Sequence, residues 1–110
     1  MLAKKYRLTK HGSFNYVYRN GRRLHSGQLT MSFVRGGKGV KIGFSVPNKV
    51  GKATVRNKLK RRMRALMHGQ TDKLCPSQIV FSAAKGADEK SFDELKVAME
   101  GLVKKSGLLK

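Results

Sequence analysis

Acidic residues are scarce in this sequence: six Asp and Glu stand against 25 Lys and Arg in 110 residues, for a net charge of +19. All six acids follow residue 71, so the 18 basic residues of 1–71 have no carboxylate among them. A site with paired carboxylates for general acid and base catalysis would therefore have to come from residues 72–110. Self-repulsion at this charge density opposes a compact state. A polyanion would relieve it, and nucleic acid is the commonest such partner.

Cysteine and long apolar runs are scarce as well. Cys75 is the single cysteine and forms no internal disulfide, which favours a reducing compartment and excludes a cysteine-rich metal cluster. The chain has no run of about 18 apolar residues, so we expect no transmembrane helix, and its charged N-terminus lacks the apolar stretch of a signal peptide. The three histidines are far apart in the sequence, without a cluster of further ligands. We therefore expect no metal site, organic cofactor or side-chain nucleophile in this chain.

The length and the apolar pattern predict one small folded domain over residues 1–110. Hydrophobic residues make up 39% of the chain, enough for a modest core. Apolar spacing predicts helices over 10–20 and 53–67 and a last helix from Phe92, opened by a capping box at Ser91 and Glu94. Its expected apolar stripe is Phe92, Leu95, Met99, Leu102 and Val103. Alternation and turn residues predict strands, which cover 22–26, 29–35, 40–46 and 78–84. The order αβββαβα indicates an α+β fold, a single-domain α/β sandwich.

Strands 29–35 and 40–46 are apolar on one face only, whereas strand 78–84 is apolar on both. Strands 29–35 and 40–46 are expected to form a hairpin around the glycine-rich turn at 36–39. One face of this hairpin is apolar and must be covered by helices. Small and polar residues build the other face, and from them alone a solvated sheet face is the simplest interpretation: Thr30, Ser32, Gly43 and Ser45. Strand 78–84 is apolar throughout its middle, as expected for burial on both faces.

The strongest chemical signal is a run of cations on the helix 53–67. Eight of the sixteen residues from Lys49 to Arg64 are basic. Such groups beside a helix N-terminus bind phosphates well. No Glu is interleaved to offset repulsion between neighbouring cations, which argues against a merely solvated helix face. At 100° per residue the polar side of this helix, opposite the apolar stripe, carries Asn57, Lys60, Arg61 and Arg64, with Arg56 at its flank.

An anionic membrane surface is the rival partner for a basic amphipathic helix. The apolar stripe of helix 53–67 is narrow, however, and it contains neither Trp nor Phe. Such a stripe is better suited to packing against a sheet, so nucleic acid remains the favoured partner.

Residues 50–64, Val-Gly-Lys-Ala-Thr-Val-Arg-Asn-Lys-Leu-Lys-Arg-Arg-Met-Arg, resemble the RNR signature of the bacterial ribonuclease P protein subunit. The flanks agree as well, and the resemblance covers nearly the whole chain. It implies a small α/β fold with a mixed sheet and a left-handed βαβ crossover, where general rules favour a right-handed one. The agreeing flanks are Arg7-Leu8, then Phe14, Val17 and Tyr18 before Gly21, and Ile42 to Val46.

The resemblance also implies a function. The protein would assist a large catalytic RNA that removes the 5′ leader of precursor tRNA with Mg²⁺, so that the endoribonuclease centre lies in the RNA and not in this chain. Its partners would be that RNA and the leader, in the bacterial cytoplasm, without a membrane or an obligate protein partner. The implied RNA-subunit contacts are Lys52, Arg56, Asn57, Lys60, Arg61 and Arg64, and the implied leader cleft consists of Phe14, Tyr18, Thr30 and Ser32.

The chain departs from the family pattern at three places, with Ser32 for a frequent aromatic, Pro47-Asn48 for Ser-Lys, and Ala65 for a common Glu. The alternative function is a basic ribosomal or RNA-chaperone protein without a role in processing. Such a protein would need the charge but not an aromatic cleft, so Phe14, Tyr18 and the Arg56-Asn57 pair discriminate between the two.

Overall fold

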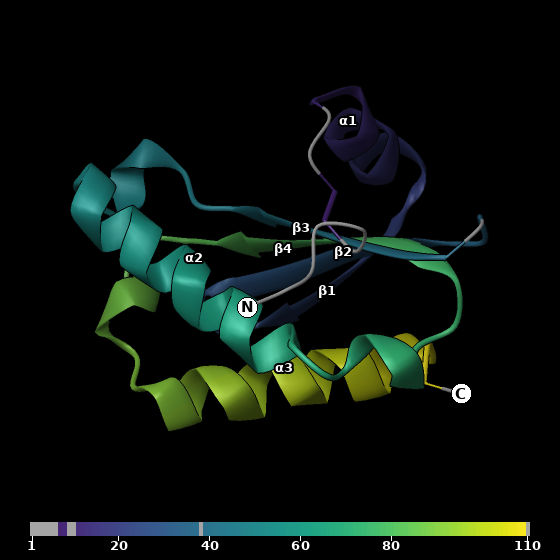
Figure 1. Ribbon diagram of the computed structural model, residues 1–110. Helices are drawn as coiled ribbons and strands as arrows, with labels where there is room; N and C mark the ends of the chain where they lie inside the picture. Colours follow the sequence, from purple (N-terminus) through teal and green to yellow (C-terminus); the bar gives the residue numbers. More distant parts are fainter. Residues whose placement is uncertain (1–6, 9–10, 38, 110) are drawn as a thin grey trace.

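A four-stranded mixed sheet carries one helix on one face and two helices on the other (Figure 1). The computed structural model describes residues 7–8, 11–37 and 39–109. The strands are β1 (Arg22–Ser26), β2 (Leu29–Arg35), β3 (Val40–Ser45) and β4 (Ser77–Ala83). The helices are α1 (His11–Asn20), α2 (Ala53–Met67) and α3 (Phe92–Ser106), and short 3₁₀ turns, η2, η3 and η4, lie at Asn48–Val50, Thr71–Lys73 and Ala87–Glu89. The predicted element order αβββαβα is confirmed, and the predicted bounds are correct to about one residue.

The expected hairpin between strands 29–35 and 40–46 is wrong, because β4 lies between β2 and β3. β4 runs antiparallel to β2 and parallel to β3. Its central residues Ile79, Val80 and Phe81 are fully buried, and a strand that is apolar on both faces is best stabilised in the interior of a sheet. The two-residue hairpin in this fold joins β1 to β2 through Gly27, whose positive φ of 58° suits such a turn.

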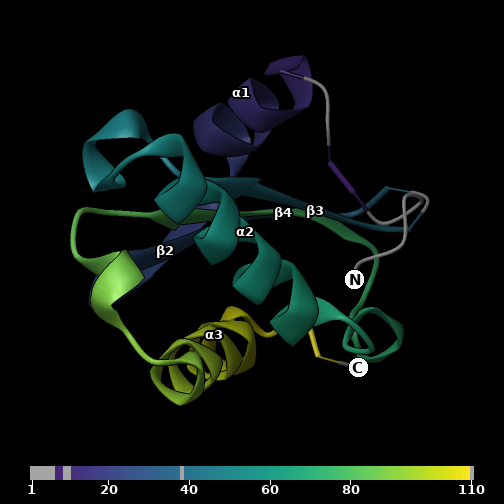
Figure 2. The same ribbon diagram turned by 60° about the vertical axis from the view of Figure 1, so that its left-hand side comes forward.

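The β3–α2–β4 connection is the predicted crossover between parallel neighbours, and its left-handedness stays a prediction. This connection brings α2 onto the same face of the sheet as α3 (Figure 2). α1 lies on the opposite face. The molecule therefore presents two separate helical layers, and the two candidate RNA-binding regions fall on different layers.

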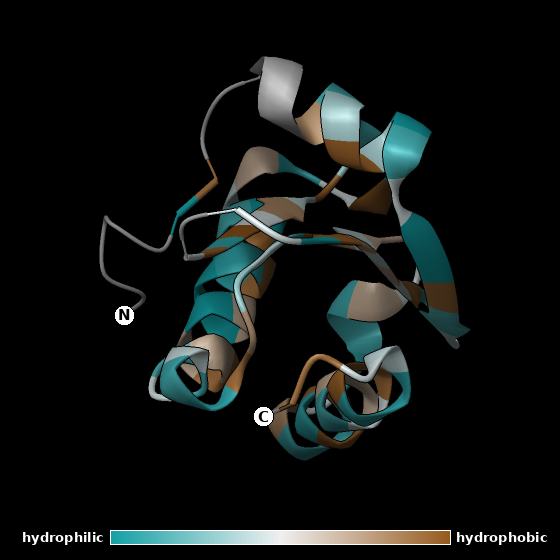
Figure 3. Cartoon of the chain, turned by 90° about the vertical axis from the view of Figure 1, so that its right-hand side faces the viewer, coloured by the Kyte–Doolittle hydropathy of each residue, from teal (hydrophilic) through white to brown (hydrophobic). Residues whose placement is uncertain are grey.

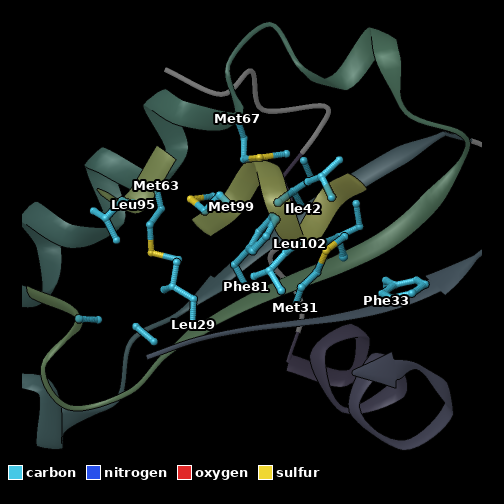
Figure 4. Packing of buried hydrophobic residues seen from close by; sticks show 14 of the residues in the cluster. Leu29, Met31, Phe33, Ile42, Met63, Met67, Phe81, Leu95, Met99 and Leu102 are labelled. Atoms are coloured by element: carbon cyan, nitrogen blue, oxygen red, sulfur yellow. The ribbon is translucent and has the colours of Figure 1, made fainter. Parts of the chain in front are cut away.

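The main core fills the space between the sheet and the helices α2 and α3 (Figure 4). Four of its buried side chains are methionines, whose flexible thioethers fill irregular gaps: Met31, Met63, Met67 and Met99. Both helices turn apolar residues toward the sheet and polar ones outward (Figure 3). The predicted stripe of α3 is confirmed from Leu95 onward, but Phe92 is 43% exposed because it is the first residue of the helix and lies at its edge.

Candidate RNA interface

The polar side of α2 forms the surface that we call the signature surface, and its residues are Thr54, Asn57, Lys60, Arg61 and Arg64. These five side chains line one shallow, open depression of about 490 Å³. Leu59 and Met63 on the other side of the helix are buried in the main core. Helical periodicity thus places the packing side chains and the polar side chains of α2 on opposite sides. Asn57, Lys60, Arg61 and Arg64, which the sequence predicts on the polar side, lie together in the structure.

Arg56 and Lys52 lie beside this surface, at the start of α2. Lys52 is the exposed N-cap residue, and its carbonyl oxygen accepts a hydrogen bond of 3.0 Å from the Arg56 backbone N–H. The Arg56 side chain is half-buried, and its Nε donates to the carbonyl oxygen of Gly51 over 3.1 Å. This hydrogen bond fixes the guanidinium against the loop before the helix. Its terminal nitrogens are left to bind an anion at the positive end of the helix dipole.

The cations of α2 divide into two groups with different surroundings. Lys58 and Arg62 share a groove of about 290 Å³ with two acids of the η4 turn, Asp88 and Glu89. No acid lines the depression of the signature surface. A phosphate would meet repulsion in the first groove and none in the second, so the electrostatics favour the signature surface as the anion-binding side of α2.

A second surface lies on the other face of the sheet, beneath and beside α1. The ring of Phe14 lies over Gly43, and Val17 and Val80 are completely buried between helix and sheet. Ser32 pairs with Val80 across the β2–β4 ladder and is only 1% exposed. The expectation that Ser32 lines an open cleft is therefore wrong. α1 covers the small residues in the middle of this face, because small side chains let a helix approach closely.

One row of polar side chains beside α1 stays accessible and crosses all four strands, and we call it the polar row. The strand register places its members side by side: His25, Thr30, Ser82 and Ser45. His25 is exposed and the other three are half-buried. The row combines hydroxyl groups and an imidazole, all of which exchange hydrogen bonds with RNA.

Tyr18 reaches this row from α1. Its hydroxyl group lies 3.4 Å from Oγ of Ser82, and its side chain is half-buried. Phe14 is half-buried as well, but its ring lies over Gly43, whereas the Tyr18 side chain ends beside the polar row, where a leader cleft needs an aromatic residue. Of the four expected cleft residues, the structure brings Tyr18 and Thr30 to the open row, places the Phe14 ring between α1 and the sheet, and buries Ser32 beneath α1.

Sequence reasoning missed three residues of these surfaces. Ser82 and His25 join Thr30 only through the strand register, and no sequence signal specifies that register. Thr54 lies on the polar side of α2 together with Asn57 and Arg61, so helical periodicity could have found it.

A basic helix surface without acids, together with a tyrosine beside a polar sheet face, defines a small α+β protein that binds nucleic acid. The sequence model of the family described as Ribonuclease P matches residues 2–107. The chain belongs to the ribonuclease P protein family. Its predicted role as the protein component of this endoribonuclease of tRNA 5′ maturation is thereby confirmed.

Relatives and solved structures agree with this assignment. The ribonuclease P protein component of Clostridium kluyveri is 33% identical over 109 residues, which cover 96% of this chain and 97% of the relative. The ribonuclease P protein component of Bacillus velezensis is 31% identical over an alignment that covers 99% of this chain and 96% of the relative. The fold resembles the Staphylococcus aureus RNase P protein, with a TM-score of 0.88 at 22% identity over 96% and 98% of the two chains. The Thermotoga maritima RNase P protein matches with a TM-score of 0.81 at 27% identity, over 90% of this chain and 96% of that protein.

These relatives are bacterial proteins. In the part of the chain that the structure describes, no helix has the length and apolar character to cross a membrane.

Proposed function

We propose that this chain binds the catalytic RNA of ribonuclease P through the signature surface, with Lys52 and Arg56, and holds the precursor-tRNA leader between α1 and the polar row. The observation that carries the proposal is the separation of the two surfaces. The signature surface belongs to α2, and the cleft belongs to α1 and the opposite face of the sheet. A protein with two independent RNA surfaces can hold a substrate against a second, catalytic RNA.

The chemistry of this arrangement is electrostatic and positional. Lys60, Arg61 and Arg64 neutralise phosphates of the catalytic RNA and release its counterions on binding. Tyr18 offers a ring face on which a base of a single-stranded leader stacks without regard to its sequence. By both contacts the protein raises the affinity for a substrate that still carries its leader.

Mg²⁺ belongs to the catalytic RNA in this proposal. Among the described residues of this chain, no three His, Cys, Asp or Glu side chains gather at one place where they could hold a metal ion. Mg²⁺ supplies charge neutralisation and activation of the attacking water at the RNA centre. The protein contributes cations nearby, which reduces the Mg²⁺ concentration needed to hold the RNA strands together.

Both proposed partners are RNAs of the bacterial cytoplasm, which is therefore the proposed location, and neither a membrane nor an obligate protein partner is required. The alternative of a ribosomal or RNA-chaperone protein is not favoured, because the family match extends over residues 2–107.

The experiment that tests this function is cleavage of precursor tRNA by a bacterial catalytic RNA at low Mg²⁺, with and without the protein. We expect the protein to restore cleavage at Mg²⁺ concentrations where the RNA alone is nearly inactive. A chain that binds the RNA but leaves cleavage unchanged would contradict the proposal.

A further inference from the structure

His25 stands at the outer end of the polar row, on the edge strand β1. Its Nδ1 lies 3.0 Å from Oγ1 of Thr30, its register partner on β2. The side chain is exposed. Nδ1 is therefore hydrogen-bonded to the neighbouring strand, and this hydrogen bond fixes the orientation of the ring. Nε2, on the far side of the ring, makes no hydrogen bond with any of the residues that the structure describes and is available for a ligand.

The surroundings of His25 determine which ligand group suits it. Arg23 lies two residues earlier on β1, on the same face of the sheet, and is exposed. Residues 11–37 contain no acid, so no carboxylate of this segment competes for either side chain. A guanidinium beside an imidazole on an acid-free surface is complementary to a phosphate group.

The polar row connects His25 to the proposed leader cleft. Thr30 and Ser82 are register partners, and Ser82 is the residue that meets the Tyr18 hydroxyl. The row spans three strand spacings, or about 14 Å. A single strand that stacks on Tyr18 and continues along the row therefore ends at His25 and Arg23.

We propose that His25 contacts a backbone phosphate of the leader through Nε2, with Thr30 holding the imidazole in place. This inference rests on the proposed function, because it assigns a further contact to the same cleft. The contact is directed at the phosphate, so its contribution is the same for leaders of different sequence. It extends the cleft from the helix α1 to the far edge of the sheet.

The test compares two substitutions that keep different halves of the imidazole. An Asn amide places its nitrogen near the position of Nδ1, so His25→Asn keeps a partner for Thr30 and loses the outward group. A Gln amide reaches about as far as Nε2, so His25→Gln keeps the outward group. His68→Ala is the matched control, because His68 is exposed at the end of α2, on the opposite layer of the molecule.

The measurement is the ratio of precursor to mature tRNA affinity for holoenzymes assembled with each variant, using two leaders of unrelated sequence. We expect His25→Asn to lower this ratio about three- to tenfold, the size of one lost hydrogen bond, for both leaders. The ratio for His25→Gln should stay close to the wild-type ratio. The ratio for His68→Ala should equal the wild-type ratio. No variant should change assembly with the catalytic RNA.

Three outcomes would overturn the inference. An unchanged ratio in His25→Asn, while Tyr18→Ala lowers it, would remove His25 from the cleft and leave the proposed function intact. Equal losses in the Asn and Gln variants would show that the outward nitrogen is not the contact. A loss confined to one leader would indicate a base in place of the phosphate. In this experiment the proposed function itself fails if the wild-type holoenzyme shows no preference for precursor over mature tRNA.

Discussion

The ring of Phe14 lies so close above Gly43 that a methyl carbon built on Gly43 would be 2.5 Å from Cζ of the ring. The carbonyl oxygen of Leu8 would be 3.1 Å from the same carbon. Phe14 can reach this position only because β3 has no side chain there. The glycine therefore sets the distance between α1 and the sheet, and with it the width of the proposed leader cleft.

This contact predicts that Gly43→Ala moves α1 away from the sheet. We expect the free energy of unfolding to fall by about 1–3 kcal/mol, as for other overpacked sites. Denaturant unfolding measures the loss. Gly39→Ala is the control, because nothing lies within 4 Å of a carbon added there and it should leave stability nearly unchanged. Equal stability of the two variants would show that Phe14 adjusts at little cost.

The sequence predicts the local elements of this fold much better than their neighbours in the sheet. Periodicity fixes both faces of helix 53–67, so the signature surface is foreseen almost completely. The order of the strands depends on contacts between distant segments, and alternation alone favoured a hairpin of the wrong pair. The apolar run of β4 was the available signal, since a strand buried on both faces belongs in the interior of the sheet.

The cleft shows the same limit at the level of single residues. Alternation places Thr30 and Ser32 on one face but does not tell which of them a helix covers. α1 covers Ser32, and Thr30 stays in the open row. Ser82 and His25 join Thr30 in the polar row only through strand pairing, which no local pattern records.

The capping box of α3 predicts an acid-dependent loss of stability. The Ser91 backbone N–H donates to the Glu94 carboxylate, and the Ser91 hydroxyl oxygen accepts from the Glu94 backbone N–H. The backbone N–H of Ser91, followed by its side chain, lowers the pKa of the Glu94 carboxyl group from the usual 4.5. A lowered folded-state pKa means that the stabilisation is complete above the unfolded-state value and is lost as the pH falls through the folded-state value. We expect the melting temperature of Glu94→Gln to lie below that of wild type at pH 7 and to approach it as the pH is lowered below about 4.5. A difference that stays constant with pH would contradict this.

Arg61 is predicted to bind the catalytic RNA without contributing to the fold. It is exposed on the signature surface, so Arg61→Ala removes a charge-assisted contact and no core volume. We expect the affinity for the catalytic RNA to fall by about 1–3 kcal/mol with an unchanged melting temperature. Arg62→Ala is the control, since Arg62 shares its groove with Asp88 and Glu89 and should cost much less affinity. Equal losses would show that overall charge, and not the signature surface, determines binding.

The number of phosphates that the protein neutralises determines how strongly its RNA affinity depends on salt. If roughly six cations meet phosphates, the logarithm of the affinity for the catalytic RNA should fall against the logarithm of the salt concentration with a slope of about −4 to −5. Arg61→Ala should reduce the magnitude of this slope by about 1. Filter binding over a range of salt concentrations measures both. A slope near zero would exclude the basic surface as the binding site.

Tyr18 is predicted to discriminate precursor from mature tRNA. Its half-buried ring stands beside the polar row, and base stacking on such a ring contributes about 1–3 kcal/mol regardless of sequence. We expect Tyr18→Ala to lower the affinity of the holoenzyme for precursor tRNA by this amount. Mature tRNA has no leader, and the catalytic RNA meets another surface, so neither affinity should change. Tyr18→Phe loses only the contact with Ser82, so it should retain most of the wild-type affinity for precursor tRNA.

Tyr16 provides the matched control for this prediction. It lies on the same helix, but the residue is 49% exposed and, unlike Tyr18, it has no hydrogen bond to Ser82 of the polar row. Tyr16→Ala should therefore leave the ratio of precursor to mature tRNA affinity unchanged, since it removes an equal ring from the same helix outside the cleft. If both variants lower the ratio equally, the leader follows the outer face of α1. If neither does while both proteins stay folded, Tyr18 is a packing residue and the leader binds elsewhere.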